Sequence, residues 1–207
     1  PIVAIRRSFI IEPDETMVID IVTGVTETRE AAQALIEKYH DRRLTERVFE
    51  LAWTHSKVVI RQLGGTEAEA QVYGRIASSV VYASTIRRAP ADVLARNRRG
   101  QPGLWGYGIS GDFPIVLLRV SDVSKIEFVR QCVRAYAYWR MKGLAADLVI
   151  LNEDTSGYRQ NLHDQIIGMI AGGTEVHMID RPGGIFVRRA DQITDDVFRF
   201  ALHEFVG

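Results

Sequence analysis

Cysteine is almost absent from this chain of 207 residues, which contains only Cys132. A single cysteine cannot form an internal disulfide, so the sequence favours a reducing compartment. Cys132 shares an apolar helical pattern with Val129, Val133 and Tyr136, which predicts a buried core thiol. The histidines are equally uninformative, because their spacing matches no metal site: His40, His55, His163, His177 and His203. We therefore predict no metal and no cofactor.

An excess of charge of either sign is also missing. The 26 Lys and Arg residues are balanced by 26 Asp and Glu residues, so nothing favours nucleic acid or an anionic membrane surface. No apolar run approaches the roughly 20 residues of a membrane-spanning helix, and no signal peptide pattern is present. We expect no nucleic-acid partner and no membrane contact by this segment.

The first 25 residues have a pattern typical of strands. The chain begins with Pro1 instead of an initiator Met, and residues 2–11 and 16–22 read as two strands around a turn at Pro13 and Asp14. We expect that more protein precedes this chain and that residues 1–25 are the terminal strands of an upstream β-sandwich. The exposed edges of such a ribbon can pair with a second copy, which predicts a homodimer through these strands.

Residues 26–95 are predicted to be a helical linker block. Helical periodicity begins near Thr26 and returns over residues 44–63, and a third helix runs from Thr66 to about residue 82. Thr66 and Glu69 have the spacing of a capping box, which marks the start of that third helix.

Residues 96–207 are predicted to be a glycine-rich loop followed by a small α/β domain. We expect strands at 114–120, 147–151, 175–179 and 184–188, with helices at 124–142, 157–171 and 194–205. Strands that alternate with crossover helices indicate a parallel sheet with right-handed connections. The fold class is therefore α/β: a strand pair, a helical linker, and a small three-layer parallel α/β domain.

The loop at residues 96–112 is the first candidate site. Its five glycines between Gly100 and Gly111 exclude a regular helix, and a phosphate-binding loop is disfavoured because no strand precedes it. Aromatic faces beside planar polar side chains suit sugar rings or a partner protein. The candidate carbohydrate-binding residues are Arg96, Arg98, Trp105, Tyr107 and Asp112. The alternative is an aromatic staple that fixes the loop to its domain.

A second candidate site follows the predicted strands. Ligands of open α/β sheets gather at the carboxyl ends of strands, which predicts a nucleotide-sugar or small-ligand site at Ser121, Asn152, Glu153 and Arg181. Carboxylate catalysis by Asp112, Glu153 or Asp154 is a further alternative. Residues after strands also serve as ordinary helix caps, and we assign no catalytic residue.

Several segments of the chain resemble the carboxyl-terminal, glycoside-phosphorylase-like region of cyclic β-1,2-glucan synthases. They are LAWTHS at 51–56, RNRRGQPGLWGYGISGD at 96–112, LVILNE at 148–153 and PGGIFV at 182–187. The resemblance implies a segment between a β-sandwich and a catalytic barrel of a large bacterial glycosyltransferase that uses UDP-glucose. It also implies a place on the cytoplasmic side of the inner membrane, in a membrane-anchored parent, with the other domains of the parent chain and β-1,2-glucan as partners.

The leading hypothesis is a non-catalytic structural and interaction module of such a synthase. The parent is expected to be an enzyme of the glycosyltransferase and glycoside-phosphorylase type, whereas this segment alone is not expected to be catalytic. Two alternatives stay open: a glucan-processing fragment with carboxylate catalysis, and a module that binds a nucleotide sugar or another small ligand.

Overall fold

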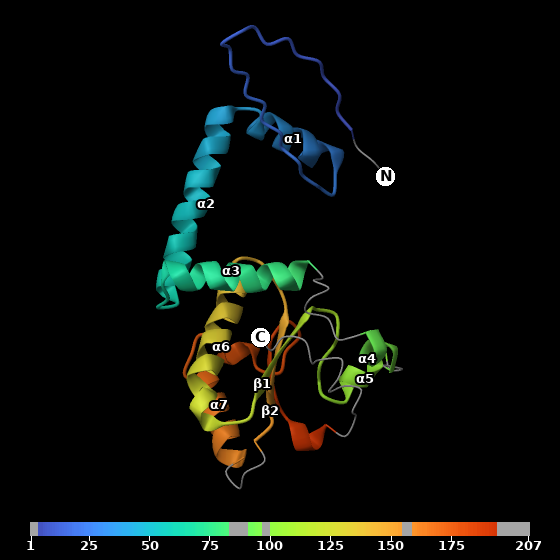
Figure 1. Ribbon diagram of the computed structural model, residues 1–207, viewed down its shortest axis with the longest axis vertical. Helices are drawn as coiled ribbons and strands as arrows, with labels where there is room; N and C mark the ends of the chain where they lie inside the picture. The colour runs from blue at the N-terminus through green and yellow to red at the C-terminus, as the bar shows by residue number, and fades with distance from the viewer. Residues whose placement is uncertain (1–3, 83–90, 97–99, 155–158, 194–207) are drawn as a thin grey trace. The chain divides into compact units, whose positions relative to one another are not determined.

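The computed structural model describes residues 4–82, 91–96, 100–154 and 159–193 (Figure 1). The chain divides into two compact units, residues 1–56 and residues 57–207, and each is described by itself. Across the described ranges, every helix is too short or too polar to cross a membrane.

The first unit begins with extended backbone and contains no strand within residues 4–28. The turn predicted around Pro13 is present, with the Glu15 amide donating to the Glu12 carbonyl at 3.1 Å and Asp14 at a φ of 63°. Neither of the two predicted strands is formed within residues 4–22. A two-stranded ribbon is marginal in water without further strands, and the apolar side chains here are open to solvent, Val25 to 96%.

Two helices complete the first unit. Helix α1 spans Arg29–Tyr39 and starts three residues after Thr26, because the Thr28 hydroxyl caps it by accepting from the Ala31 amide at 3.2 Å. Helix α2 spans Arg42–Gln62, close to the predicted 44–63, and its last residues belong to the second unit.

The second unit opens with α3, Glu67–Val81, which begins with the predicted capping box. The Thr66 amide donates to Glu69 Oε2 at 2.6 Å, and the Glu69 amide donates to Thr66 Oγ1 at 3.2 Å. Two short helices, α4 (Ala91–Arg96) and α5 (Pro102–Trp105), follow. The expectation that the glycines between Gly100 and Gly111 exclude a regular helix is wrong for α5, a single turn that fits between Gly100 and Gly106 and has Pro102 at its first position.

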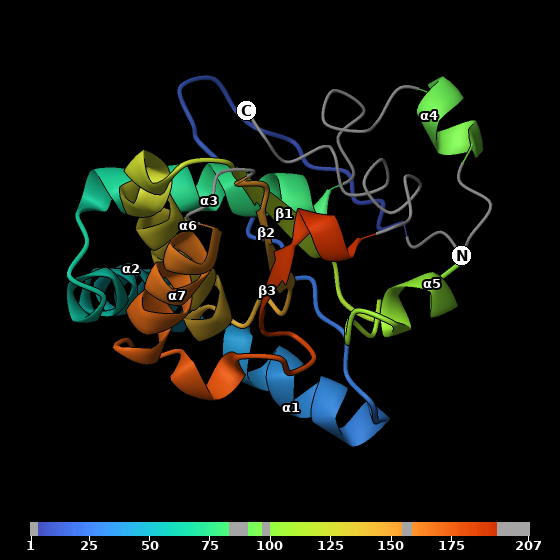
Figure 2. The same ribbon diagram turned by 90° about the horizontal axis from the view of Figure 1, so that it is seen from below.

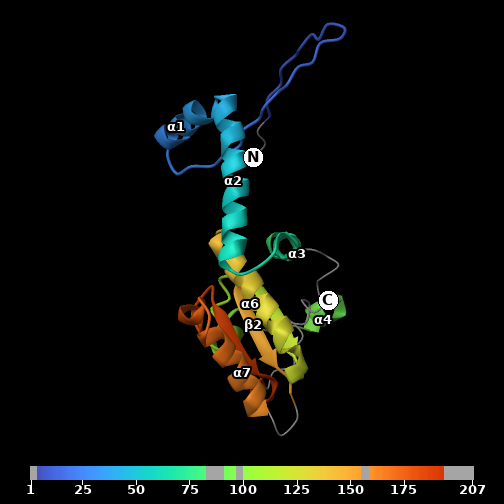
Figure 3. The same ribbon diagram turned by 90° about the vertical axis from the view of Figure 1, so that its left-hand side faces the viewer.

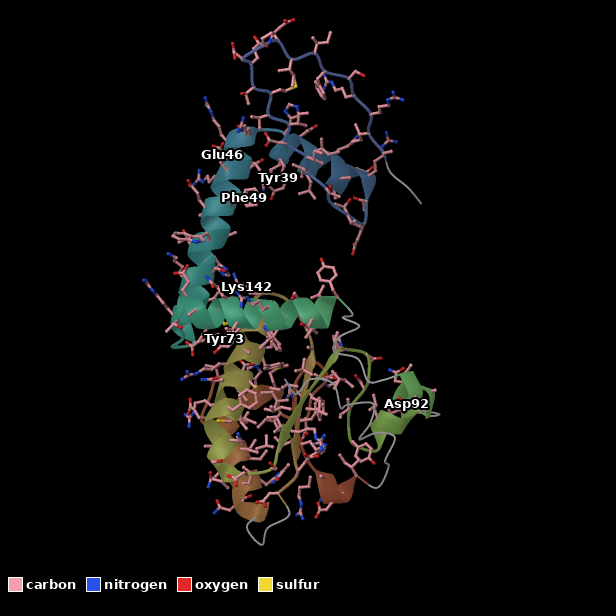
Figure 4. The ribbon with its side chains drawn as sticks, viewed as in Figure 1. Tyr39, Glu46, Phe49, Tyr73, Asp92 and Lys142 are labelled. Atoms are coloured by element: carbon pink, nitrogen blue, oxygen red, sulfur yellow. The ribbon has the colours of Figure 1, made fainter. Side chains whose placement is uncertain are left out.

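Helix α3 packs against α6, Ile126–Met141, which follows a 3-10 turn at Val123–Lys125. The Trp139 indole of α6 donates to the Tyr73 carbonyl at 2.7 Å, and Figure 4 shows Tyr73 on the side of α3 that faces α6. The predicted division at 1–25, 26–95 and 96–207 stays a prediction, but this helix of the predicted linker shares a compact unit with the sheet.

The centre of the second unit is a three-stranded parallel sheet. Strands β1 (Ile115–Val120), β2 (Asp147–Asn152) and β3 (Ile185–Arg189) lie in the order β1-β2-β3. Leu117 pairs with Val149, which pairs with Phe186. The predicted parallel α/β class is confirmed.

One predicted strand is wrong. Within residues 175–179 the chain forms a 3-10 helix, Val176–Met178, and only Ile179 makes an isolated bridge to Ile185. The segment predicted at 184–188 takes the place beside β2 instead, where the apolar residues Ile185, Phe186 and Val187 are buried. The helix predicted at 194–205 lies outside the described residues.

The two faces of the sheet have different covers (Figure 2). Helices α6 and α7 (Arg159–Ala171) pack on the face that carries Val116, Leu148 and Ile150, and Figure 3 shows both helices on this side. Among the described residues, the opposite face is covered mainly by Leu104, Tyr107 and Ile109 of the glycine-rich loop, with Ile193. Within the described ranges, most of the cover on this face therefore comes from the loop that the sequence marked as a candidate site.

Candidate functional site

The glycine-rich loop, residues 100–112, is held in shape by hydrogen bonds within itself. The side-chain amide of Gln101 donates to the Ser110 carbonyl at 2.8 Å and to Asp112 Oδ1 at 2.7 Å, so it closes the two ends of the loop. Gly111 has a φ of +76°, and a Cβ there would lie 2.8 Å from Cγ of Gln101. This glycine is therefore required both by its backbone conformation and by the close approach of Gln101.

Trp105 is the exposed aromatic residue of this loop. Its side chain is 61% exposed, while its indole Nε1 donates to the Ser110 carbonyl at 3.2 Å. The hydrogen bond restrains the ring, and the exposed area leaves apolar surface available for a ligand. A restrained exposed indole is suited to stack on the apolar face of a sugar ring, because little side-chain freedom remains to be lost on binding.

Tyr107 has a different environment from Trp105. It is half-buried and packs with Ile109 against the sheet, as the staple interpretation predicts for an aromatic that fixes the loop. The loop thus combines an inward-facing anchor with one exposed ring.

The other predicted residues of this first site are only partly described. Asp112 is exposed and accepts from Gln101. Arg96 is the last residue of α4, but its side chain lies outside the described part of the structure, as does the whole of Arg98.

The structure brings together only some residues of the second candidate site, at the carboxyl ends of the strands. Ser121 follows β1, and Asn152 ends β2 beside it, because Val120 pairs with Asn152. Asn152 is buried, and its Oδ1 accepts from the Asp154 amide at 3.0 Å. Arg181, in contrast, lies at the opposite edge, because it precedes β3. Its predicted place among the site residues assumed that 175–179 was the strand.

Glu153 is held in an ion pair that the sequence reasoning missed. Its Oε1 lies 2.6 Å from Nη2 and 2.9 Å from Nε of Arg119, on the neighbouring strand. The available signal was an arginine inside the otherwise apolar strand IVLLRV, since such a charge needs a partner. This ion pair connects the end of β2 to β1.

Two further charged groups lie toward the amino ends of the strands, and they were not identified from the sequence. Asp147, the first residue of β2, is completely buried and accepts from the Gly183 amide at 2.7 Å. Glu175 is buried and pairs with Arg140, Nε to Oε2 at 2.8 Å. Over the described ranges, His, Cys, Asp and Glu form no group of three or more that could hold a metal ion.

Burial governs the ionisation of two groups on α6. Cys132 is partly buried against the core, not completely buried as predicted, and burial raises the pKa of its thiol to about 11, so the thiol is unreactive near neutral pH. Burial, with the Glu175 carboxylate as a second cause, raises the pKa of Tyr136 to about 12. The Tyr136 hydroxyl donates to the Gly183 carbonyl at 2.5 Å. Tyr136 thereby fixes the turn before β3, and with pKa values this high both groups are unsuited to acid or base chemistry near neutral pH.

Comparison with known proteins gives two matches. The supersandwich domain of glycosyl hydrolase 94 matches residues 1–42. The cyclic beta-(1,2)-glucan synthase NdvB of Rhizobium meliloti (strain 1021) is 32% identical over 169 residues, which is 82% of this chain and 6% of the relative. The resemblance drawn from the sequence motifs is thereby confirmed, and this chain corresponds to a small part of that relative's length.

Proposed function

We propose, from the relationship of this chain to a cyclic β-1,2-glucan synthase, that it is a non-catalytic structural and interaction module of such an enzyme. The carrying observation is the 32% identity over 169 residues, together with the loop that displays Trp105. In this proposal the loop presents its indole ring to a β-1,2-glucan chain. The remaining described residues pack the loop and contact other domains of the parent chain.

The environments of three carboxylates, Glu153, Glu175 and Asp147, support a non-catalytic role for these side chains. A general acid or base must reach the proton of a bound substrate. Glu153 and Glu175 are engaged by arginines, and Asp147 is sealed inside the protein. These contacts suit residues that hold elements together.

The setting of the module is part of the same proposal. We place it on the cytoplasmic side of the bacterial inner membrane, in a membrane-anchored parent, with no membrane or nucleic-acid contact of its own. Pairing of two copies through residues 4–22 remains a proposal, and the apolar side chains exposed along that segment support it.

Titration with β-1,2-glucooligosaccharides tests the glucan-presenting role. We expect saturable changes in the indole NMR resonance of Trp105, with a dissociation constant on the order of 1 mM, or about 4 kcal/mol of binding free energy. Trp105→Ala should abolish binding. Trp53→Ala is the matched control, because Trp53 is 60% exposed but lies in the first unit, and it should bind as the original chain does.

Two outcomes would contradict the proposal. No response of Trp105 at millimolar glucan would remove the glucan-presenting role. The non-catalytic role fails if the chain converts linear β-1,2-glucan, with or without phosphate, to shorter or cyclic products that disappear in Glu153→Gln.

A further inference from the structure

Arg188 on β3 makes the contacts that connect the glycine-rich loop to the sheet. Its Nε donates to the Tyr107 carbonyl at 2.8 Å, and its Nη1 donates to the Val187 carbonyl at 2.9 Å. The guanidinium also lies over the Phe186 ring, with its carbon 5.3 Å from the ring centroid. Because these groups are partly buried, the guanidinium is restrained on several sides.

Asp180 forms an ion pair with the same guanidinium. Its Oδ1 lies 2.8 Å from Nη1 of Arg188, although the Asp180 side chain is largely exposed. Asp180 has a φ of +55°, which is an unfavourable backbone conformation for a residue with a side chain. Its amide donates to the Ile185 carbonyl at 3.0 Å, so the strained turn is locked to the start of β3. Aspartate is one of the residue types that occupy this conformation most readily, so the turn can place the Asp180 carboxylate on Arg188.

Gly108 completes the junction on the loop side. It has a φ of +74°, and a Cβ at this position would lie 3.2 Å from Nη2 of Arg188. The backbone of the loop and the guanidinium therefore approach each other closely at a residue without a side chain. This contact is three residues from Trp105, inside a turn where the Gly108 amide donates to the Trp105 carbonyl at 3.0 Å.

We propose that Arg188 and Asp180 are a positioning pair that sets the conformation of the glycine-rich loop and thereby the presentation of Trp105. The consequence for binding rests on the proposed function, in which the ligand is a β-1,2-glucan. A loop that is ordered before the ligand arrives has less conformational entropy to lose on binding. The pair acts through the backbone of Tyr107 and Gly108 and does not itself touch the sugar.

The first test is residue-resolved hydrogen exchange on the whole chain without any ligand. The amides of Tyr107, Gly108 and Ile109 donate to carbonyls inside the loop and report its order. Arg188→Met keeps most of the aliphatic stem but removes the guanidinium, and Asp180→Asn removes the charge while keeping a residue that tolerates positive φ. Both should speed exchange of the three loop amides by about tenfold and leave the β2 amides unchanged.

Matched controls use neighbours of the same type. Arg189→Met removes the next arginine on β3, which pairs with Asp191. Asp14→Asn changes the other aspartate with a positive φ, in the turn at residues 12–15. Neither control should alter exchange in the loop. Arg188→Lys should restore only part of the protection, because one ammonium group cannot reproduce the planar set of contacts to Tyr107 and Asp180.

The second test is glucan affinity measured at the Trp105 indole resonance. Both positioning variants should weaken binding by about tenfold, in step with the faster loop exchange. The proposal is contradicted if the two variants leave hydrogen exchange in the loop unchanged, or if they speed exchange of the loop amides and the β2 amides by the same factor. It is also contradicted if a variant with faster loop exchange binds glucan with unaltered affinity. If the original chain fails to bind glucan, the proposed function fails, and the exchange experiment alone decides whether the pair sets the loop.

Discussion

At the residue scale, Asp147 shows how burial changes the behaviour of a carboxyl group. It is completely buried at the start of β2, and Oδ2 has no partner among the described residues. Burial raises its pKa from the ordinary 3.8, although hydrogen bonds from the backbone of Gly183 and Gly184 oppose the rise and Asp112 adds to it. The folded protein therefore holds this proton more tightly than the unfolded chain does.

Asp147→Asn should change how stability depends on pH. Asp147 contributes most to the free energy of unfolding below pH 3.8, and that contribution is lost as the pH rises through the raised pKa. Asparagine resembles the protonated acid and does not titrate, so the variant should gain stability relative to the original chain as the pH rises. Urea unfolding at several pH values between about 3.5 and 7 measures this difference.

Asp122→Asn is the control, because its stability relative to the original chain should change with pH in the opposite direction. The backbone amide of Ser124 lowers the pKa of Asp122, so its contribution is present above pH 3.8 and lost as the pH falls. This variant should lose stability relative to the original chain as the pH rises. A difference for Asp147→Asn that stays constant with pH would show that burial does not control its titration.

At the scale of elements, the turn that leads into β3 depends on Gly184. A Cβ at this position would meet the carbonyl oxygens of Met178 and Arg181, the latter at 2.5 Å, and backbone cannot move away as a side chain can. The same segment holds the Gly183 amide on Asp147 and the Gly183 carbonyl on Tyr136. Packing between segments therefore demands a glycine here.

Gly184→Ala and Gly168→Ala should have effects of opposite sign. The first should lower the free energy of unfolding by about 3 kcal/mol, because the turn must distort. Gly168 lies inside α7, and a Cβ added there would meet no atom within 4 Å, so alanine should raise the free energy of unfolding by about 0.8 kcal/mol through helix propensity. Chemical denaturation compares the three proteins, and equal effects of the two substitutions would refute the packing argument.

At the scale of the whole molecule, the core residues of the sheet all belong to one compact unit. Both apolar clusters, on the two faces of the sheet, are formed by residues from Ile60 to Ile193. The boundary between the units falls within α2, after Ser56. The second unit thus carries its own core, which is the main requirement for independent folding.

A chain that begins at Lys57 should keep the fold of the second unit. We expect the Trp139 indole to remain hydrogen-bonded to Tyr73 and the β2 amides to remain protected, because their partners all follow residue 57. NMR spectra and hydrogen exchange compare it with the whole chain. Collapse of the β2 protection would show that residues 1–56 supply stability that the contacts within the second unit do not account for.

Local signals were sufficient for much of this fold. The capping box at Thr66, the helical periods and the two apolar strands at 115–120 and 147–152 depend on neighbours within a few residues, so the sequence predicted them. The loop at 100–112 was also visible, because its glycines and Trp105 stand together in the chain. Its candidate role could be predicted from residue type alone.

The sequence by itself thus determined the α/β class, the longer helices α1, α2, α3, α6 and α7, and the place of the candidate loop. Tertiary structure decided which segment pairs with β2, and hence that Arg181 lies at the opposite edge from Ser121. It also decided that Trp105 is exposed while Tyr107 packs inward, and that Arg188 reaches the loop from 81 residues away. Strand pairing and burial are set by contacts between distant segments. Residues 175–179 and 184–188 both contain apolar residues, and no local pattern shows which of them pairs with β2.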